Sequence, residues 1–171
     1  MSGRVYLKLT FVEGGTAIEG ESTVDSIGGV DVSKFIECEG FTESMMTAQD
    51  AASRTPTGQR IFEPVIVRKW VDKSSPELAK ALCETAKMIG EFHFFRPSAE
   101  NAQMELFFTV KIEDARVSAI KRFLPEAATD IALAGKPPLE LVSFVFGKIT
   151  WRHLPGNKEH TDTWRQQSVP S

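Results

Sequence analysis

Apolar and polar residues alternate along most of the chain. In the clearest run, residues 103–113, the apolar positions are Met104, Leu106, Phe108, Val110 and Ile112. Further strand-like runs lie at residues 4–11, 16–22, 30–38, 60–72, 90–96, 115–123 and 139–152. A period of two residues is typical of strands that bury one face. The pattern therefore predicts a mainly β protein of about eight strands.

One segment has a helical period instead. Its apolar positions are Leu78, Leu82, Ala86 and Ile89, spaced so that they share one face of a helix. Ser74 and Glu77 have the spacing of a capping box. Alternatively, Ser75 caps the helix and Pro76 is its first residue, where a missing N–H group costs nothing.

Gly90 is suited to end this helix, which is therefore expected to cover about residues 75–89. No repeat, low-complexity run or Gly/Ser linker divides the sequence. We expect residues 1–171 to form a single domain, an antiparallel β-barrel or sandwich (two packed sheets) with one flanking α-helix.

Two of the expected strands need cover beyond the barrel interior, from the helix or from a neighbouring subunit. Residues 139–152 are apolar on both faces, so both faces require cover. Pro64 lies inside the run at 60–72 and removes a donor from the sheet, which places that strand at an edge or at a bulge. Self-association is one way to cover such surfaces.

Residues 41–59 have neither a strand nor a helix period. Irregular segments of more than about 12–15 residues are usually functional or disordered. Met45 and Met46 supply flexible, polarisable side chains that suit an interface. We therefore expect either a functional extended loop or a disordered surface loop at this place. A second irregular stretch, residues 125–138, contains no motif that we can assign.

Composition and charge exclude several classes of protein. The chain has 171 residues, of which 42% are hydrophobic, and a net charge of −3 with no basic run, so nucleic acid is not an expected partner. The longest stretch without a charged residue, 141–147, is too short to span a bilayer. The N-terminal residues lack the apolar core of a signal peptide. Cys38 and Cys83 are isolated and predict no disulfide framework.

The candidate chemistry is weak. Gly15 and Gly20 have the spacing of a phosphate-binding loop, but Glu21 stands where the lysine of that motif belongs. Two carboxylate pairs lie at i, i+2: Glu19 with Glu21, and Glu37 with Glu39. Such pairs on strands usually form a solvated face rather than a hydrolytic site. The histidines have no zinc spacing, and we predict no catalytic, cofactor or metal site.

Several short segments occur along the chain in an order that is typical of one protein family. They are Tyr6-Leu7-Lys8-Leu9, Ile18-Glu19-Gly20-Glu21-Ser22, Val30-Asp31-Val32, Gly58-Gln59-Arg60-Ile61, Asp72-Lys73-Ser74-Ser75-Pro76-Glu77-Leu78, Lys148-Ile149-Thr150-Trp151 and His160-Thr161-Asp162-Thr163-Trp164. Together they resemble the haemolysin-coregulated protein (Hcp) family, the tube subunits of bacterial type VI secretion systems. The resemblance covers nearly the whole chain.

The resemblance implies a tail-tube-like barrel that assembles as hexameric rings. The rings stack into a tube inside a contractile sheath, which drives the tube and a spike protein into a neighbouring cell. Small effector proteins travel in the lumen. Catalysis, cofactors and a membrane anchor are not expected. The protein is expected to be cytoplasmic before firing and then secreted without a cleaved signal peptide.

The resemblance also assigns provisional roles to residues. The expected ring and stacking interface in the extended loop is Glu43, Met45, Met46, Gln49, Asp50 and Arg54. Candidates for lumen-facing or subunit-contact positions are Glu19, Glu21, Ser33 and Glu37. The structural motif residues are Asp72, Ser74, Ser75, Pro76, Trp151, Asp162 and Trp164.

Two alternatives stay open at the level of sequence. One is a small-barrel monomer that binds or hydrolyses a ligand, since Trp70, Trp151 and Trp164 could line a pocket. The other is a phage tail-tube or baseplate-type structural protein of the same fold. A barrel interior filled with apolar side chains would count against the first.

Overall fold

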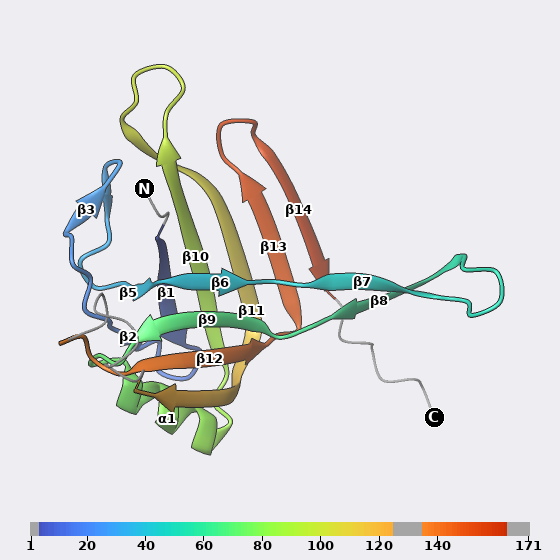
Figure 1. The fold of residues 1–171 in the computed structure, drawn as a ribbon, viewed down its shortest axis with the longest axis horizontal. Helices are drawn as coiled ribbons and strands as arrows, with labels where there is room; N and C mark the ends of the chain where they lie inside the picture. Colours follow the sequence, from blue (N-terminus) through green and yellow to red (C-terminus); the bar gives the residue numbers. More distant parts are fainter. Residues whose placement is uncertain (1–3, 125–134, 164–171) are drawn as a thin grey trace.

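The protein is a mainly antiparallel β structure with one helix in the part of the chain that the computed structural model describes, residues 4–124 and 135–163 (Figure 1). Its elements are β1 (Val5–Phe11), β2 (Ala17–Ile18), β3 (Ser26–Ile27), β4 (Val30–Asp31), β5 (Ile36–Cys38), β6 (Gly40–Thr42), β7 (Met45–Gln49), β8 (Pro56–Phe62), β9 (Val65–Trp70), α1 (Ser75–Glu84), β10 (Met88–Pro97), β11 (Met104–Phe123), β12 (Leu139–Val145), β13 (Lys148–His153) and β14 (Lys158–Thr163). The predicted fold class is confirmed. Trp164 and most of the stretch 125–138 lie outside the described residues.

The main strands pair in a closed circuit. The order β1-β10-β11-β12-β9-β6 is antiparallel at every step, and β5 pairs antiparallel with β1. Only Glu39 separates β5 from β6, and its N–H donates to the carbonyl of Arg68 in β9 at 2.7 Å. The pairing therefore returns to β1, which gives the barrel that the sequence predicts.

Strand β11 joins the barrel to a second sheet. Its first half pairs with β10 on one edge and β13 on the other, and its second half pairs with β12. Strands β13 and β14 therefore extend the β10–β11 sheet as a wing (Figure 1). The two runs expected at 103–113 and 115–123 form one strand, β11. It turns at Asp114, where φ is 50°, and carries a bulge between Val117 and Ala119.

The barrel interior is filled by side chains. Strands β1, β10, β11 and β12 contribute many of the buried apolar side chains of the core, and the Phe41 ring meets those of Phe92 and Phe94 edge to face at 4.9 and 5.0 Å. Phe92 and Phe144 are fully buried. This packing disfavours the ligand-binding alternative, which needs an enclosed cavity.

Helix α1 lies across one end of the barrel and buries Leu78 and Ala81. It is shorter than the expected 75–89, because Thr85 adopts a left-handed conformation (φ 52°) and ends it. Gly90 belongs to β10, where it pairs with Leu9. Ile89, the last apolar position of the helical period, therefore lies in strand β10 and not in the helix.

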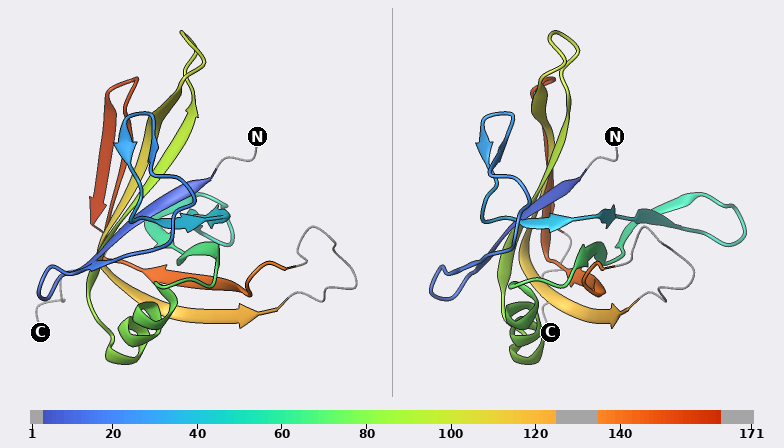
Figure 2. Two further views of the ribbon diagram at one scale, coloured as in Figure 1. Left: turned by 90° about the vertical axis from the view of Figure 1, so that its left-hand side faces the viewer. Right: turned by 60° about the vertical axis from the view of Figure 1, so that its left-hand side comes forward.

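The extended loop expected at residues 41–59 is a β-hairpin. Strands β7 and β8 pair with each other and project away from the barrel (Figures 1 and 2). Both faces of the hairpin are largely exposed, so no apolar alternation marks these strands in the sequence. At its tip, the Asp50 N–H donates to the Thr55 carbonyl at 2.9 Å.

The strands expected at residues 60–72 and 139–152 are each divided in the structure. Pro64 falls between β8 and β9 rather than inside a strand, and Gly147 separates β12 from β13. The doubly apolar run 139–152 therefore serves two sheets, because β12 pairs with β9 and β13 pairs with β14. The runs at 16–22 and 30–38 retain only the short strands β2, β4 and β5.

Candidate assembly site

The β7–β8 hairpin presents apolar side chains to solvent. Met45, Met46 and Ile61 are 51%, 49% and 41% exposed. Met46 lies opposite Ile61 in the register, and Met45 lies opposite Phe62. Successive residues of a strand point to opposite faces, so the Met46–Ile61 pair is on one face of the hairpin and Phe62 is on the other. A projecting apolar pair of this kind is typical of a protein interface.

The base of the hairpin is fixed to the wing. The indole N–H of Trp151 donates to Glu43 Oε1 at 2.6 Å, and the Phe62 ring stacks on Trp151 with 6.3 Å between centroids. Arg60 pairs with Asp162 of β14 at 2.6 Å. We call these residues (Glu43, Arg60, Phe62, Trp151 and Asp162) the hairpin anchor. The anchor sets the direction in which the hairpin projects.

The sequence assigns these residues to separate groups. It predicts Glu43 in the loop interface, and Trp151 and Asp162 as structural motif residues. The structure brings them together through the β13–β14 hairpin, whose strands pair Trp151 with His160. Half-burial raises the pKa of Glu43, and the hydrogen bond from Trp151 only partly offsets this.

Three loop candidates, Gln49, Asp50 and Arg54, lie toward the tip of the β7–β8 hairpin and are exposed. Gln49 ends β7. Asp50 Oδ1 accepts hydrogen bonds from the N–H groups of Ser53 and Ala52 at 2.8 and 3.0 Å, and these bonds lower the pKa of Asp50. Arg54 has φ 56° and makes no ion pair with any described residue. The tip therefore presents one unpaired cation.

A second cluster lies in the barrel wall beside the start of α1. Lys69 of β9 is opposite Glu140 of β12, and both are fully buried. Their charged groups are 2.6 Å apart, and Lys69 Nζ is also 3.0 Å from Asp72 Oδ1. Arg122 of β11 binds the second oxygen of Glu140 at 2.6 Å. Ser75 Oγ donates to Glu140 Oε1 at 2.7 Å.

This network explains the predicted structural motif at residues 72–76. Ser74 donates from both N–H and Oγ to Asp72 Oδ1, so the Asp72 carboxylate, rather than a capping box, orders the helix start. Pro76 is in the first turn as expected. Lys69 and Glu140 were missed, although both occupy positions of strands that the apolar pattern assigns to a buried face.

The four lumen or contact candidates have different surroundings. Glu37 is buried, pairs with Arg4 at 2.5 Å and accepts from the N–H and hydroxyl of Thr23. Glu19 lies 3.5 Å from Lys34 and 3.4 Å from Lys73. Ser33 donates to Asp31 within a turn. Glu21 is exposed.

A larger polar surface was not anticipated. Alternate side chains of β10, β11, β13 and β14 line a shallow hollow of about 360 Å³ on one side of the wing: Glu91, Thr109, Lys111, Glu113, Lys148, Thr150, Arg152, Glu159 and Thr161. We call this set the polar wing face. Its carboxylates and cations are equal in number, and Glu113 lies 3.2 Å from Lys148 and 3.8 Å from Lys111.

The described residues offer little for catalysis. No group of three or more His, Cys, Asp or Glu side chains among them is arranged to hold a metal ion. Burial raises the pKa of the Cys38 thiol to about 12, so this thiol is not a nucleophile at neutral pH. Within residues 4–124 and 135–163, no helix is long and apolar enough to cross a membrane.

Known proteins match this chain over almost its whole length. The family model described as "Type VI secretion system effector, Hcp" matches residues 6–153. The "Major exported protein" of Pseudomonas aeruginosa is 32% identical over 169 residues, which cover 96% of this chain and 97% of that protein.

Solved structures agree as well. A crystal structure of an Hcp protein superposes with a TM-score of 0.82 at 25% identity, covering 96% of this chain and 99% of that one. The Hcp1 protein of the E. coli EAEC 042 pathovar gives a TM-score of 0.78 at 28% identity, covering 94% and 97%. The chain therefore belongs to the Hcp family, the tube subunits of type VI secretion systems.

Proposed function

We propose that this chain forms hexameric rings that stack end to end into a secretion tube, with the β7–β8 hairpin as the main contact between copies. The observation that carries the proposal is the projecting hairpin itself. It has exposed apolar side chains, yet its base is held in one direction by the hairpin anchor. A rigid projection of this kind supports binding, because little freedom is lost when it docks.

Ring closure requires two different surfaces on each subunit, related by a rotation that closes. Among the described residues, β14 pairs only with β13, so its outer edge is open. An open edge favours pairing with a strand from another chain. We infer that the sheet continues from one subunit to the next at or near this edge.

We propose that the polar wing face lines the lumen. Four strands contribute to it, and its charges balance one another. A balanced polar surface holds a folded protein weakly, which suits transport of small effectors that must later leave. The earlier candidate Glu37 fits this role less well, because it is buried against Arg4.

Membership of the family supports a proposal about wider partners. We propose that the tube sits within a contractile sheath, carries a spike at its tip, and is exported from the cytoplasm without a cleaved signal peptide. The name of the Pseudomonas aeruginosa relative, a major exported protein, supports export. We propose a structural rather than an enzymatic role.

Assembly of the purified protein tests this proposal. Native mass spectrometry should give a hexamer of the 19.0 kDa chain, and negative-stain images should show rings. Replacing Met45 and Arg54 together with alanine should prevent stacking and secretion while the barrel stays folded by circular dichroism. Monomers alone over a wide concentration range would rule the proposal out.

A further inference from the structure

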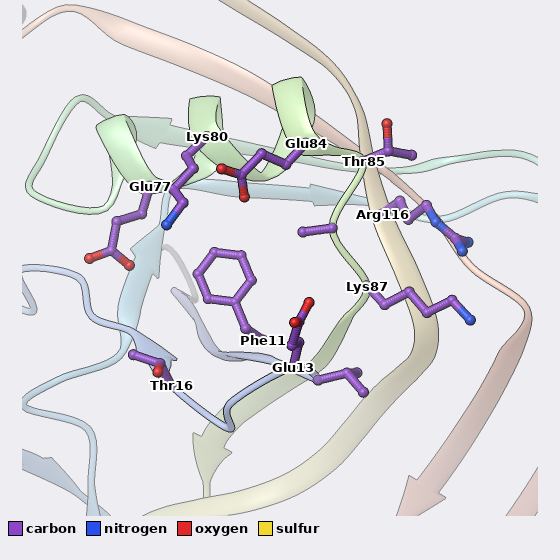
Figure 3. A pocket seen from close by; sticks show the side chains of 11 residues that line it. Phe11, Glu13, Thr16, Glu77, Lys80, Glu84, Thr85, Lys87 and Arg116 are labelled. Atoms are coloured by element: carbon purple, nitrogen blue, oxygen red, sulfur yellow. The ribbon is translucent and has the colours of Figure 1, made fainter.

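A groove of about 680 Å³ lies between α1 and the turn that joins β1 to β2 (Figure 3). Phe11 and Ala86 are half-buried in it, and Val12 is 51% exposed. Glu77, Lys80 and Glu84 extend from α1 at one side, and Lys87 and Arg116 lie at the other. These residues make an apolar floor with a charged rim.

The rim carries a small excess of negative charge. Three carboxylates and three cations line the groove: Glu13, Glu77, Glu84, Lys80, Lys87 and Arg116. Lys87 and Arg116 share the carboxylate of Asp114, which is not part of the lining, at 3.8 and 3.3 Å, so four carboxylates stand against three cations. Glu13, Glu77 and Glu84 have no ion-pair partner in the described part of the chain. The groove therefore suits an occupant that brings a positive charge and a small apolar surface.

The tip of the β7–β8 hairpin has both properties. Ala51 and Ala52 are small and exposed. Arg54 is exposed and makes no ion pair within residues 4–124 and 135–163, and the carboxylate of Asp50 is turned back onto N–H groups of the tip itself. The tip thus presents a cation and two methyl groups.

The tip cannot reach the groove of its own subunit. Figures 1 and 2 show the hairpin projecting from the barrel away from α1. Strand β8 alone has seven residues and extends for about 23 Å at the usual rise of a strand. Any groove that receives the tip must therefore belong to a second copy.

We propose that the α1 groove receives the hairpin tip of a neighbouring copy, with Ala51 and Ala52 against Phe11 and Val12 and Arg54 among the rim carboxylates. This inference rests on the proposed function and identifies the receiving surface for the hairpin. The two surfaces differ, so the contact is heterologous and propagates from copy to copy. Opposite charges on the two surfaces also fix the partner and its orientation.

Charge exchange tests the pairing. Arg54→Glu and Glu84→Arg should each raise the subunit concentration needed for pelletable tubes by about tenfold, because each places like charges together. The double variant Arg54→Glu/Glu84→Arg should return to within about threefold of the wild type, since it restores opposite charges. A matched control is Arg54→Glu with Glu100→Arg, which reverses an exposed carboxylate outside the groove and should not restore assembly.

Cross-linking gives a second readout that does not depend on tube yield. In a Cys83→Ser background, Arg54→Cys combined with Glu84→Cys should form disulfide-linked ladders in a non-reducing gel, and either cysteine alone should not. The inference is overturned if the ladder is absent, if Arg54→Glu assembles normally, or if the charge exchange fails to restore tubes. A wild-type protein that never assembles overturns the proposed function as well.

Discussion

At the residue scale, the most demanding feature of the barrel is the ion pair between Lys69 and Glu140. Both side chains lie fully out of contact with water, and the burial of charge is costly unless every group is paired. Burial raises the pKa of Glu140, but hydrogen bonds from Lys69, Ser75 and Arg122 outweigh it, so the net shift is downward. The stabilising contribution of Glu140 is therefore present above pH 4.5 and is lost as the pH falls.

Replacing Lys69 alone should therefore destabilise the protein. We expect Lys69→Met to lower the free energy of unfolding by about 3 kcal/mol, because Glu140 is left buried with only Arg122 and Ser75. Chemical denaturation at a fixed protein concentration measures the change. Lys69→Met combined with Glu140→Met should recover part of the loss, since the fully buried Glu140 carboxylate is removed, while Asp72 and Arg122 each lose one partner. A single variant as stable as the wild type would contradict this interpretation of the network.

Glu43 in the hairpin anchor leads to a prediction with the opposite pH dependence. Its pKa is raised, mainly by burial, so at pH 7 the ionised side chain opposes folding. Glu43→Gln keeps an oxygen acceptor for the Trp151 indole and removes the charge. We expect its thermal midpoint to exceed that of the wild type by a few degrees at pH 7. The advantage should disappear as the pH falls below 4.5, where Glu43 is protonated in both states.

At the scale of elements, apolar periodicity predicts a strand or helix only where one of its faces is buried. Strand β11 follows its alternation closely, because the barrel covers one side of it. Strands β7 and β8 are exposed on both sides, so their sequence resembles that of a loop. The predicted end of α1 is too late because Ile89 has helical spacing. In the structure, Ile89 and Gly90 belong to β10 and pair with Thr10 and Leu9 of β1.

The helix provides a matched pair of substitutions. Leu78 is 1% exposed, whereas Leu82 is only partly buried against the core. We expect Leu78→Ala to lower the free energy of unfolding by about 2–5 kcal/mol, because it leaves a cavity under the helix. Leu82→Ala should cost clearly less, although both residues fit the helical period equally well. Equal losses in chemical denaturation would show that α1 packs on the barrel in another way.

At the scale of the whole molecule, the sequence predicts the barrel and the need for a partner but not the surfaces involved. The hairpin anchor joins Glu43 to Trp151 across more than a hundred residues, and only the order of the strands brings them together. The groove beside α1 likewise combines the β1–β2 turn with residues from α1 and β11. The spacing of residues along the sequence carries no information about such long-range contacts.

The polar wing face supplies the last prediction. If this face lines a closed lumen, each charge on it is repeated around the ring at short distances. Lys111→Glu with Lys148→Glu lowers the charge of each subunit's face by four and removes both cations from Glu113. We expect rings to be lost at about 0.1 M salt, where the screening length is about 10 Å, and to return at about 1 M, where it is about 3 Å.

A matched control for this prediction changes the net charge equally at another place. Lys121→Glu with Lys136→Glu alters two exposed lysines that are not part of the polar wing face. These changes should leave ring formation insensitive to salt, because charges outside a lumen remain separated and well solvated. Ring content by native mass spectrometry over a salt series compares the two variants. If they behave alike, the polar wing face lies outside the tube, and the lumen must be lined by another surface.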